Sequence, residues 1–124
     1  MSGKRFLLDS NVIIRLSKRD SSVIDFIKQS SSQNYISIIT YMEVLGFPFG
    51  SEAEFNFVKE LVSLFELIHI DQTIADQTVE IRQKYKIKLP DAVIAATAQV
   101  CDCTLLTANV DDFKCIKMLD VLVK

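Results

Sequence analysis

The stretch FLLDSNV, residues 6–12, joins an apolar run to the beginning of a helical pattern. The apolar residues before Asp9 predict a buried strand, because a short apolar run that ends at a polar residue is typical of a parallel sheet. The pattern over residues 11–18 predicts an amphipathic helix, which Ser10 or Asn11 can cap. An acidic residue therefore stands at the junction of a strand and a helix.

Two further acids stand at junctions of the same kind. In YISIITYMEVLGF, residues 35–47, a strand-like run leads into a helical pattern that holds Glu43. In KLPDAVIAATAQV, residues 88–100, Pro90 lies near the first position of an Ala-rich helix, and Asp91 lies beside it in the first turn. The carboxyl ends of neighbouring parallel strands and the helices that follow them share one edge of a sheet. We therefore expect the three acids to converge on one crevice, where carboxylates favour a hard divalent cation.

Apolar runs and helical patterns alternate along the whole chain. Strands separated by helices indicate right-handed crossovers and a mainly parallel sheet, so the expected fold class is α/β. The expected strands cover about residues 5–8, 35–39, 66–70 and 104–107, with a last one inside 116–123. The expected helices cover about residues 11–18, a short segment capped by Ser21 or Ser22, a segment around Glu43, a capping-box helix over 51–65, residues 71–85 with Asp71 as the cap, and a segment from Pro90.

The size and composition of the chain fit one domain. Its 124 residues suffice for a sheet covered by helices on both faces and are too few for a second core, so we expect one domain over residues 1–124. Hydrophobic residues make up 49% of the chain, yet no apolar run reaches the roughly 18 to 20 residues that span a bilayer. The N-terminus lacks the apolar stretch of a secretory signal. We expect a cytoplasmic protein that does not bind a membrane.

The number of cysteines is odd, which argues against a disulfide framework and favours reduced thiols. Cys101, Cys103 and the lone His69 could be imagined as a zinc site. They lack the paired CxxC spacing of structural zinc sites, however, and no residue offers a convincing fourth ligand. We expect the cysteines, Cys115 included, to be apolar fillers and His69 to lie on one face of a strand.

Four segments of the chain carry a family resemblance. LDSNV (8–12), TYMEVL (40–45), LPDAVIAATA (89–98) and LLTANVDDF (105–113) resemble, in order and spacing, the PIN-domain family, and most of all the small toxin ribonucleases of VapBC-type toxin–antitoxin modules. The last two segments together are the most specific part. The resemblance implies a three-layer α/β/α sandwich with a central mainly parallel sheet, a Mg²⁺ or Mn²⁺ site built from the acids, RNA as the substrate, and inhibition by a cognate antitoxin.

The resemblance also assigns roles to individual residues. Asp9, Glu43 and Asp91 match the first three metal-site acids of the family. Asn109 falls where many members have a fourth acid, and Asp112, three residues later, could compensate for the lost charge. The polar residues that match positions beside the site are Ser10, Asn11 and Thr107.

The chemistry of these residue types agrees with such a site. Mg²⁺ binds oxygen ligands and usually keeps several waters, with one or two carboxylates and substrate phosphate as its other ligands. A bound cation can lower the pKa of its water and neutralise charge on a phosphate transition state. We expect Asp9 and Asp91 to be direct ligands, and Glu43 to bind through water or to orient the nucleophile.

Each acid also has a structural alternative. Thr40 and Glu43 form the T-x-x-E pattern of a capping box, so Glu43 could merely satisfy a backbone N–H. Asp91 in a first turn complements the helix dipole. Asp9 at the end of a buried strand needs a partner, and no fixed cation is evident nearby in the sequence. The recurrence of acids at the same edge of successive units favours the metal site over three separate coincidences.

The net charge of −2 is not that of a general nucleic-acid binder, so any contact with RNA must be local. Two basic clusters are candidates for that contact. The alternative is that they are solvated helix ends, with cations near a helix C-terminus. The candidates are Arg15, Lys18 and Arg19 in the first cluster and Arg82, Lys84, Lys86 and Lys88 in the second.

The function that we expect is a metal-dependent endoribonuclease, the toxin of a toxin–antitoxin pair. The alternative is a catalytically inactive PIN-like scaffold that lost turnover through Asn109 and binds RNA or protein. A haloacid-type phosphatase needs an Asp two residues after Asp9, where Asn11 stands, and a phosphotransfer receiver needs an acid where Ser10 stands. A DNA nuclease of the same fold would need added elements for which the chain has little room.

Phenylalanines concentrate between residues 47 and 65. They could pack in the core, or they could form a dimer face or a groove for the antitoxin. A homodimer is therefore among the expected assemblies. The residues concerned are Phe47, Phe49, Phe55, Phe57 and Phe65.

Overall fold

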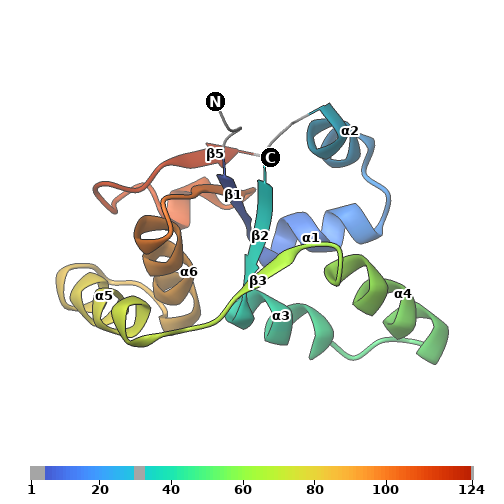
Figure 1. The fold of residues 1–124 in the computed structure, drawn as a ribbon, viewed down its shortest axis with the longest axis horizontal. Coiled ribbons are helices and arrows are strands. Elements are labelled where there is room, and N and C mark those ends of the chain that lie inside the picture. Colours follow the sequence, from blue (N-terminus) through green and yellow to red (C-terminus); the bar gives the residue numbers. More distant parts are fainter. Residues whose placement is uncertain (1–4, 30–32, 124) are drawn as a thin grey trace.

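A computed structural model of the chain describes residues 5–29 and 33–123. Within these residues, five strands form one sheet in the order β3-β2-β1-β4-β5, and every neighbouring pair is parallel (Figure 1). The predicted α/β fold with a mainly parallel sheet is confirmed. The strands are β1 (Arg5–Leu8), β2 (Gln33–Ser37), β3 (Glu66–Ile68), β4 (Thr104–Thr107) and β5 (Val121–Val123).

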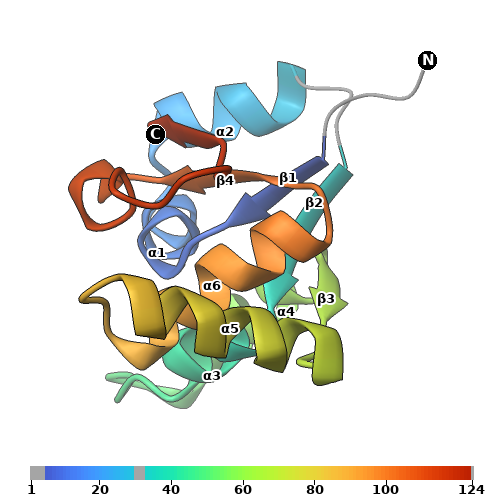
Figure 2. The same cartoon turned by 90° about the vertical axis from the view of Figure 1, so that its left-hand side faces the viewer.

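Helices cover both faces of the sheet. α5 and α6 lie on one side, and α1, α2 and α4 lie on the other (Figure 1, Figure 2). None of the described helices is long and apolar enough to cross a membrane. The helices are α1 (Ser10–Ser17), α2 (Ser21–Gln29), α3 (Ile38–Leu45), α4 (Glu52–Val62), α5 (Gln72–Lys84) and α6 (Leu89–Val100), and a 3-10 turn, η1, covers Val110–Asp112.

The alternation of side chains along the strands produces a separate core on each face of the sheet. On one face, Leu7 and Leu105 are fully buried in the cluster that contains the inward residues of α5 and α6. On the other face, Leu8 and Leu106 are fully buried with Val12 of α1 and its neighbours. Residues 6–8 are therefore apolar without interruption because both faces of β1 are covered.

α6 is shielded from solvent along its middle, where every residue from Ala92 to Ala98 is buried. Its alanines let α5 and the sheet approach closely, because a methyl group takes little space. Pro90 lies in the first turn, as predicted, and Lys88 stands at the N-cap position without a side-chain capping bond. This packing fixes the start of α6, and with it Asp91, relative to the sheet.

The start of α1 differs from the prediction. The cap is Asp9, whose Oδ1 accepts a hydrogen bond from the Ser10 N–H at 2.8 Å, so the predicted cap by Ser10 or Asn11 is wrong. Asp serves at this position as well as Ser or Asn. The predicted caps of the later helices are confirmed at Ser51 for α4 and Asp71 for α5.

The junction of β2 and α3 also differs from the prediction. The strand ends at Ser37, whose Oγ accepts a hydrogen bond from the Ile39 N–H at 3.1 Å and caps the helix. Ile38 and Ile39 were expected in the strand because β-branched residues favour it. Thr40 therefore lies inside the first turn of α3, and the predicted capping box of Thr40 and Glu43 is wrong.

Three other boundaries are shifted. The start of α2 is held by Asp20, whose Oδ1 accepts hydrogen bonds from the N–H and Oγ of Ser22 at 3.0 and 2.9 Å, in place of the predicted serine cap. α4 ends at Val62 rather than at residue 65. β3 ends at Ile68, so His69 is exposed beyond the strand and not on its face as predicted.

Candidate functional site

Asp9 lies at the carboxyl end of β1, where only 5% of it is exposed. Its backbone N–H donates to the carbonyl of Leu106 at 2.9 Å, next to the pairing of β1 with β4. The side chain accepts three hydrogen bonds: Oδ1 from the Ser10 N–H at 2.8 Å, and Oδ2 from Thr107 Oγ1 at 2.8 Å and Asn11 Nδ2 at 3.2 Å. A carboxylate oxygen has two lone pairs, so Oδ2 is saturated and Oδ1 keeps one lone pair for a cation.

Asn11 and Thr107 tie the start of α1 to the turn that follows β4. Asn11 Nδ2 lies 3.2 Å from Thr107 Oγ1, and Asn11 Oδ1 accepts a hydrogen bond from the Ala108 N–H at 3.0 Å. Thr107 Oγ1 also accepts one from the Asn109 N–H at 3.0 Å. The structure thus brings these two polar residues, which the motif placed beside Asp9, into direct contact with its carboxylate.

Glu43 lies on α3, at the sixth of its eight residues, and its side chain is exposed. The Oγ of Ser10 donates a hydrogen bond to Glu43 Oε1 at 2.7 Å. Among the described residues, no donor contacts Oε2. Glu43 does not belong to a capping box, because it lies outside the first turn of α3. Its hydrogen bond to Ser10 places it beside Asp9.

Asp91 lies in the first turn of α6 and is partly buried. Burial raises the pKa of its carboxyl above the ordinary 3.8, and the negative charges of Asp9, Asp112 and Glu43 raise this pKa further. Lys88 acts in the opposite direction. Because the charges of these three acids act on Asp91, the four acids share one region at the carboxyl edge of the sheet.

The turn after β4 presents Asn109 and Asp112, and both residues are exposed. The N–H of Asp112 donates to the carbonyl of Asn109 at 3.1 Å and closes the turn. Asp112 brings a charge that acts on Asp91, whereas its neighbour Asp111 pairs with Lys114 at 3.2 Å. Asp112 therefore adds to the acidic region, while Asn109 offers it only a neutral amide.

In residues 5–29 and 33–123, no three side chains of His, Cys, Asp or Glu are arranged to hold a metal ion by themselves. The acids nevertheless fit a hard divalent cation, because they are oxygen donors and their charges repel one another around Asp91. Mg²⁺ usually takes one or two carboxylates directly and keeps several waters. A cation at this edge would complete its ligand shell with water or with substrate phosphate.

The first basic cluster lies at the end of α1. The guanidinium of Arg15 pairs with Asp20 Oδ2 at 2.9 Å and so stabilises the turn between α1 and α2. Lys18 and Arg19 are exposed, and the guanidinium of Arg19 lies 6.0 Å from the centre of the Phe57 ring. Arg15 thus has a structural role of its own.

The second basic cluster is divided between two places. Lys88 lies beside the acids, since its charge acts on Asp91. Lys84 lines a separate cleft on the α5 side of the molecule. The remaining members, Arg82 and Lys86, are exposed.

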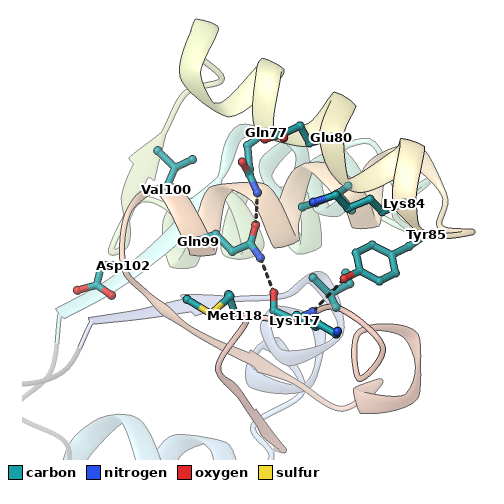
Figure 3. A pocket seen from close by; sticks show the side chains of 11 residues that line it. Gln77, Glu80, Lys84, Tyr85, Gln99, Val100, Asp102, Lys117 and Met118 are labelled. Carbon is teal, nitrogen blue, oxygen red and sulfur yellow. Dashed lines mark hydrogen bonds between the residues drawn. The ribbon is translucent and has the colours of Figure 1, made fainter.

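That cleft, of about 690 Å³, opens between α5, the end of α6 and residues 116–118 (Figure 3). Gln77 Nε2 donates to Gln99 Oε1 at 2.7 Å, and Gln99 Nε2 donates to the carbonyl of Lys117 at 3.0 Å. The Lys117 N–H donates in turn to the hydroxyl of Tyr85 at 3.3 Å. None of the four acids lines the cleft, and these bonds hold the segment before β5 against the two helices.

Among the described residues, no three side chains of His, Cys, Asp or Glu form a metal-binding group, so nothing in the structure supports the zinc alternative. The three cysteines are free. Cys103 is a buried filler, as predicted, and burial raises the pKa of its thiol to about 11. Cys115 is exposed, so the prediction of an apolar filler is wrong for it.

Two features of the site were not predicted. Asp9 both caps α1 and presents a carboxylate to the site. Its position directly before a helical pattern could have indicated the cap, because Asp is a common N-cap residue. Thr40 is 1% exposed in the first turn of α3, one turn before Glu43. The burial of Thr40 can be predicted only when it is known that the helix begins at Ile38.

The comparisons with known proteins agree with this architecture. The sequence profile of the PIN domain matches residues 6–117. A chain from a toxin–antitoxin complex of Klebsiella pneumoniae has 37% sequence identity and a TM-score of 0.79, with 94% of each chain covered. VapBC-1 from nontypeable Haemophilus influenzae has 25% identity and a TM-score of 0.81, covering 96% of this chain and 97% of that one. VapBC2 from Rickettsia felis, bound to a DNA fragment from its promoter, has 21% identity and a TM-score of 0.86, covering 97% and 98%.

No curated protein matches the chain. The resemblance predicted from the motifs is nevertheless confirmed, because the family profile covers most of the sequence. The chain belongs to the PIN-domain family.

Proposed function

We propose that the protein is a metal-dependent endoribonuclease and the toxin of a toxin–antitoxin pair. The observation that carries the proposal is the convergence of Asp9, Glu43, Asp91 and Asp112 on one edge of the sheet, where three of these acids raise the pKa of the fourth. Membership of the PIN-domain family supports a nuclease, and the 37% identity with a chain of a toxin–antitoxin complex supports the biological role.

Asp9 and Asp91 are the proposed direct ligands of Mg²⁺ or Mn²⁺. Asp9 offers Oδ1, since its Oδ2 is occupied by two hydrogen-bond donors. Asp91 offers a carboxylate that the neighbouring acids destabilise, so a cation there removes an existing repulsion. When bound, the cation would supply the positive charge that polarises a phosphodiester and activates water.

Glu43 is the proposed residue that orients the attacking water. Its Oε1 is held by Ser10 Oγ at 2.7 Å, which leaves Oε2 to accept a proton from water. Water adds to phosphorus, the bond from phosphorus to one ribose oxygen breaks, and that oxygen takes up a proton as it leaves. Asp112 is the proposed acid that compensates for the neutral Asn109.

RNA contact is assigned to four exposed cations of the two basic clusters. Lys88 acts on Asp91 and is therefore the first candidate for a phosphate contact, and the exposed Lys86 lies two residues before it. Lys18 and Arg19 are exposed at the end of α1 and are the candidates on that side. Arg15 is the weakest candidate because it pairs with Asp20.

An apolar groove between α1, α3 and α4 is the proposed site for a segment of the antitoxin. It has a volume of about 240 Å³, and Ile14, Val44 and Phe49 are among its lining residues. Phe47 is 61% exposed and Phe57 is 44% exposed at this groove, more than a core residue requires. The occurrence of relatives in toxin–antitoxin complexes favours an antitoxin as the occupant, and a second copy of the chain is the alternative.

The test is cleavage of RNA by the purified chain with Mg²⁺ or Mn²⁺, with chelator, and with the Asp9→Asn variant. Asp25→Asn is the matched control, since Asp25 is an exposed acid on α2. We expect cleavage by the wild type and the control, and none with chelator or Asp9→Asn. A wild type that binds RNA but never cleaves it, with either metal, would establish the inactive scaffold instead.

A further inference from the structure

The connection between α5 and α6 has the sequence KYKIK, residues 84–88, in which partly buried and exposed side chains alternate. Tyr85 and Ile87 are partly buried and pack against the core cluster that contains α5 and α6. The backbone is extended at Tyr85 and again at Lys88, and alternate side chains of an extended segment point the same way, roughly 7 Å apart. The exposed residues therefore form a row of lysines, which consists of Lys84, Lys86 and Lys88.

The row of lysines begins beside the acids. Lys88 is the N-cap residue of α6, and Asp91 lies in the first turn of the same helix. A phosphate at a cation on Asp91 would thus be about one helical turn from Lys88. Lys86 continues the row away from the acids, so the row leads outward from the proposed cation site.

The row ends at the cleft of about 690 Å³ on the α5 side of the molecule, which both Lys84 and Lys117 line. Lys84, Tyr85 and Lys117 lie at the same end of this cleft (Figure 3). The hydroxyl of Tyr85 accepts a hydrogen bond from the Lys117 N–H at 3.3 Å, which leaves its own proton for an acceptor. This end of the cleft therefore offers two ammonium groups and a hydroxyl donor.

None of these lysines forms an ion pair with the described residues. Two acids also line the cleft. Glu80 lies one turn before Lys84 on α5, and Asp102 lies at the opposite end of the cleft from Lys117 (Figure 3). The cations thus outnumber the acid at the end where the row arrives. In a chain with a net charge of −2, unpaired cations in a row are a local feature that an anionic polymer can recognise.

We propose that the row of lysines, continued by Lys117, is a track for the phosphates of single-stranded RNA, and that the basic end of the cleft takes a nucleotide away from the scissile bond. The inference rests on the proposed function, because the track begins at the proposed cation site. A row of charges along an extended segment can follow the backbone of a single strand. The cleft offers apolar side chains and the amides of Gln77 and Gln99 to an unstacked base.

The test measures binding of the full chain to a labelled single-stranded RNA of about ten nucleotides by fluorescence anisotropy, with chelator, over a series of salt concentrations. One variant carries Lys86→Gln, and another combines Lys84→Gln with Lys117→Gln. The hydrogen bond from Lys117 to Tyr85 persists in the second variant, because its donor is the backbone N–H. Lys28→Gln is the matched control, since Lys28 is an exposed lysine in the last turn of α2, on the other face of the sheet from α5 (Figure 1).

We expect Lys86→Gln to weaken RNA binding about fivefold or more at low salt, and the double variant to weaken it further. The slope of log affinity against log salt concentration should become shallower by about 0.7 for each lysine removed, because each phosphate contact with a single strand contributes about that much. The control should bind as the wild type. Wild-type affinity and slope in both track variants, or an equal loss in Lys28→Gln, would overturn the proposal.

The outcome is separable from that of the proposed function. Expected losses of binding in a protein that never cleaves RNA, with either metal, would overturn the nuclease and leave the track. Metal-dependent cleavage by a wild type whose track variants bind RNA normally would overturn the track alone. A duplex RNA of the same length that binds as tightly, with the same losses in the variants, would overturn the assignment to single strands.

Discussion

Ser10 Oγ donates a hydrogen bond to Oε1 of Glu43 over 2.7 Å and joins the first residue of α1 to the sixth residue of α3. The bond fixes one oxygen of an otherwise exposed side chain. It also connects Glu43 to Asp9, which lies next to Ser10 and caps the same helix. The consequence is that two acids from neighbouring α/β units are held in a defined relation before any ligand binds.

Glu43→Gln should leave stability within about 0.5 kcal/mol of the wild type, because the side chain is exposed and Gln can still accept from Ser10. Cleavage should fall by about a hundredfold or more, because an amide is a poor base and a poor metal ligand. Initial cleavage rates and urea unfolding of the same preparation measure both effects. Full activity in this variant would show that Glu43 has no part in the chemistry.

Asp9→Asn should abolish cleavage and also lower stability by about 1 to 3 kcal/mol. The carboxylate accepts three hydrogen bonds, and the amide group of Asn would face at least one of those donors with an N–H of its own. Circular dichroism should show a retained fold, and urea titration gives the stability change. If the variant is as stable as the wild type, the stabilisation lost with the hydrogen bonds to Asp9 is offset by relief of its repulsion with the other acids.

The fold was predictable because short apolar runs mark the strands, and the bounds of β1 and β4 match the prediction. Asp9 terminates β1, and both faces of the sheet are covered, so an uninterrupted apolar run of this length indicates a buried strand. The end of β2 was not predictable, since Ile38 and Ile39 suit a strand and a helix equally well by their apolar character. The choice depends on the capping bond of Ser37, which only the three-dimensional structure reveals.

The gathering of the acids was predictable from topology, but the contacts among them were not. Parallel strands place their carboxyl ends on one edge, which brings together residues that are far apart in sequence. The bonds of Asn11 to Thr107 and Ala108 depend on the register of β1 with β4 and on side-chain conformations. No spacing in the sequence encodes them.

Asp91→Asn should stabilise the metal-free protein at neutral pH. The pKa of Asp91 is raised in the folded state, so the unfolded state loses this proton first as the pH rises. Protonation of Asp91 therefore stabilises the native state. The free energy of unfolding falls as the pH increases from the ordinary pKa of 3.8 to the raised pKa of Asp91 in the folded protein. Asp91→Asn does not show this fall. Its free energy of unfolding, relative to that of the wild type, should therefore increase between these two pH values and then remain constant.

Urea unfolding in the presence of chelator, at a series of pH values, measures the difference between wild type and Asp91→Asn. Asp25→Asn controls for the change in net charge, because Asp25 is an exposed acid on α2. An advantage of Asp91→Asn that is independent of pH, or equal to that of the control, would contradict the assigned repulsion among the acids.

The three thiols should react at very different rates. Cys103 is buried and its pKa is about 11, so roughly one molecule in a thousand carries the reactive thiolate at pH 8. Cys115 is exposed and should react with a thiol reagent first. Cys115→Ser should remove the fast phase of labelling under native conditions, and mass spectrometry identifies the modified residue. Rapid labelling of Cys103 in the native protein would show that the segment before β4 opens far more readily than the burial of Cys103 implies.

The charge at the turn after β4 should set the affinity for the cation. Asn109→Asp adds an acid where the protein has a neutral amide, so it should tighten Mn²⁺ or Mg²⁺ binding, whereas Asp112→Asn should weaken it, because Asp112 already acts on Asp91. Ligand binding stabilises a protein by RT ln(1 + [L]/Kd), which is about 2.7 kcal/mol at a hundredfold excess over Kd. A thermal-shift titration with each metal therefore measures both changes, and Asp111→Asn is the matched control, since Asp111 pairs with Lys114 at 3.2 Å. If both substitutions leave the metal-dependent shift unchanged, the turn lies outside the coordination sphere and the proposed cation site is limited to Asp9, Glu43 and Asp91.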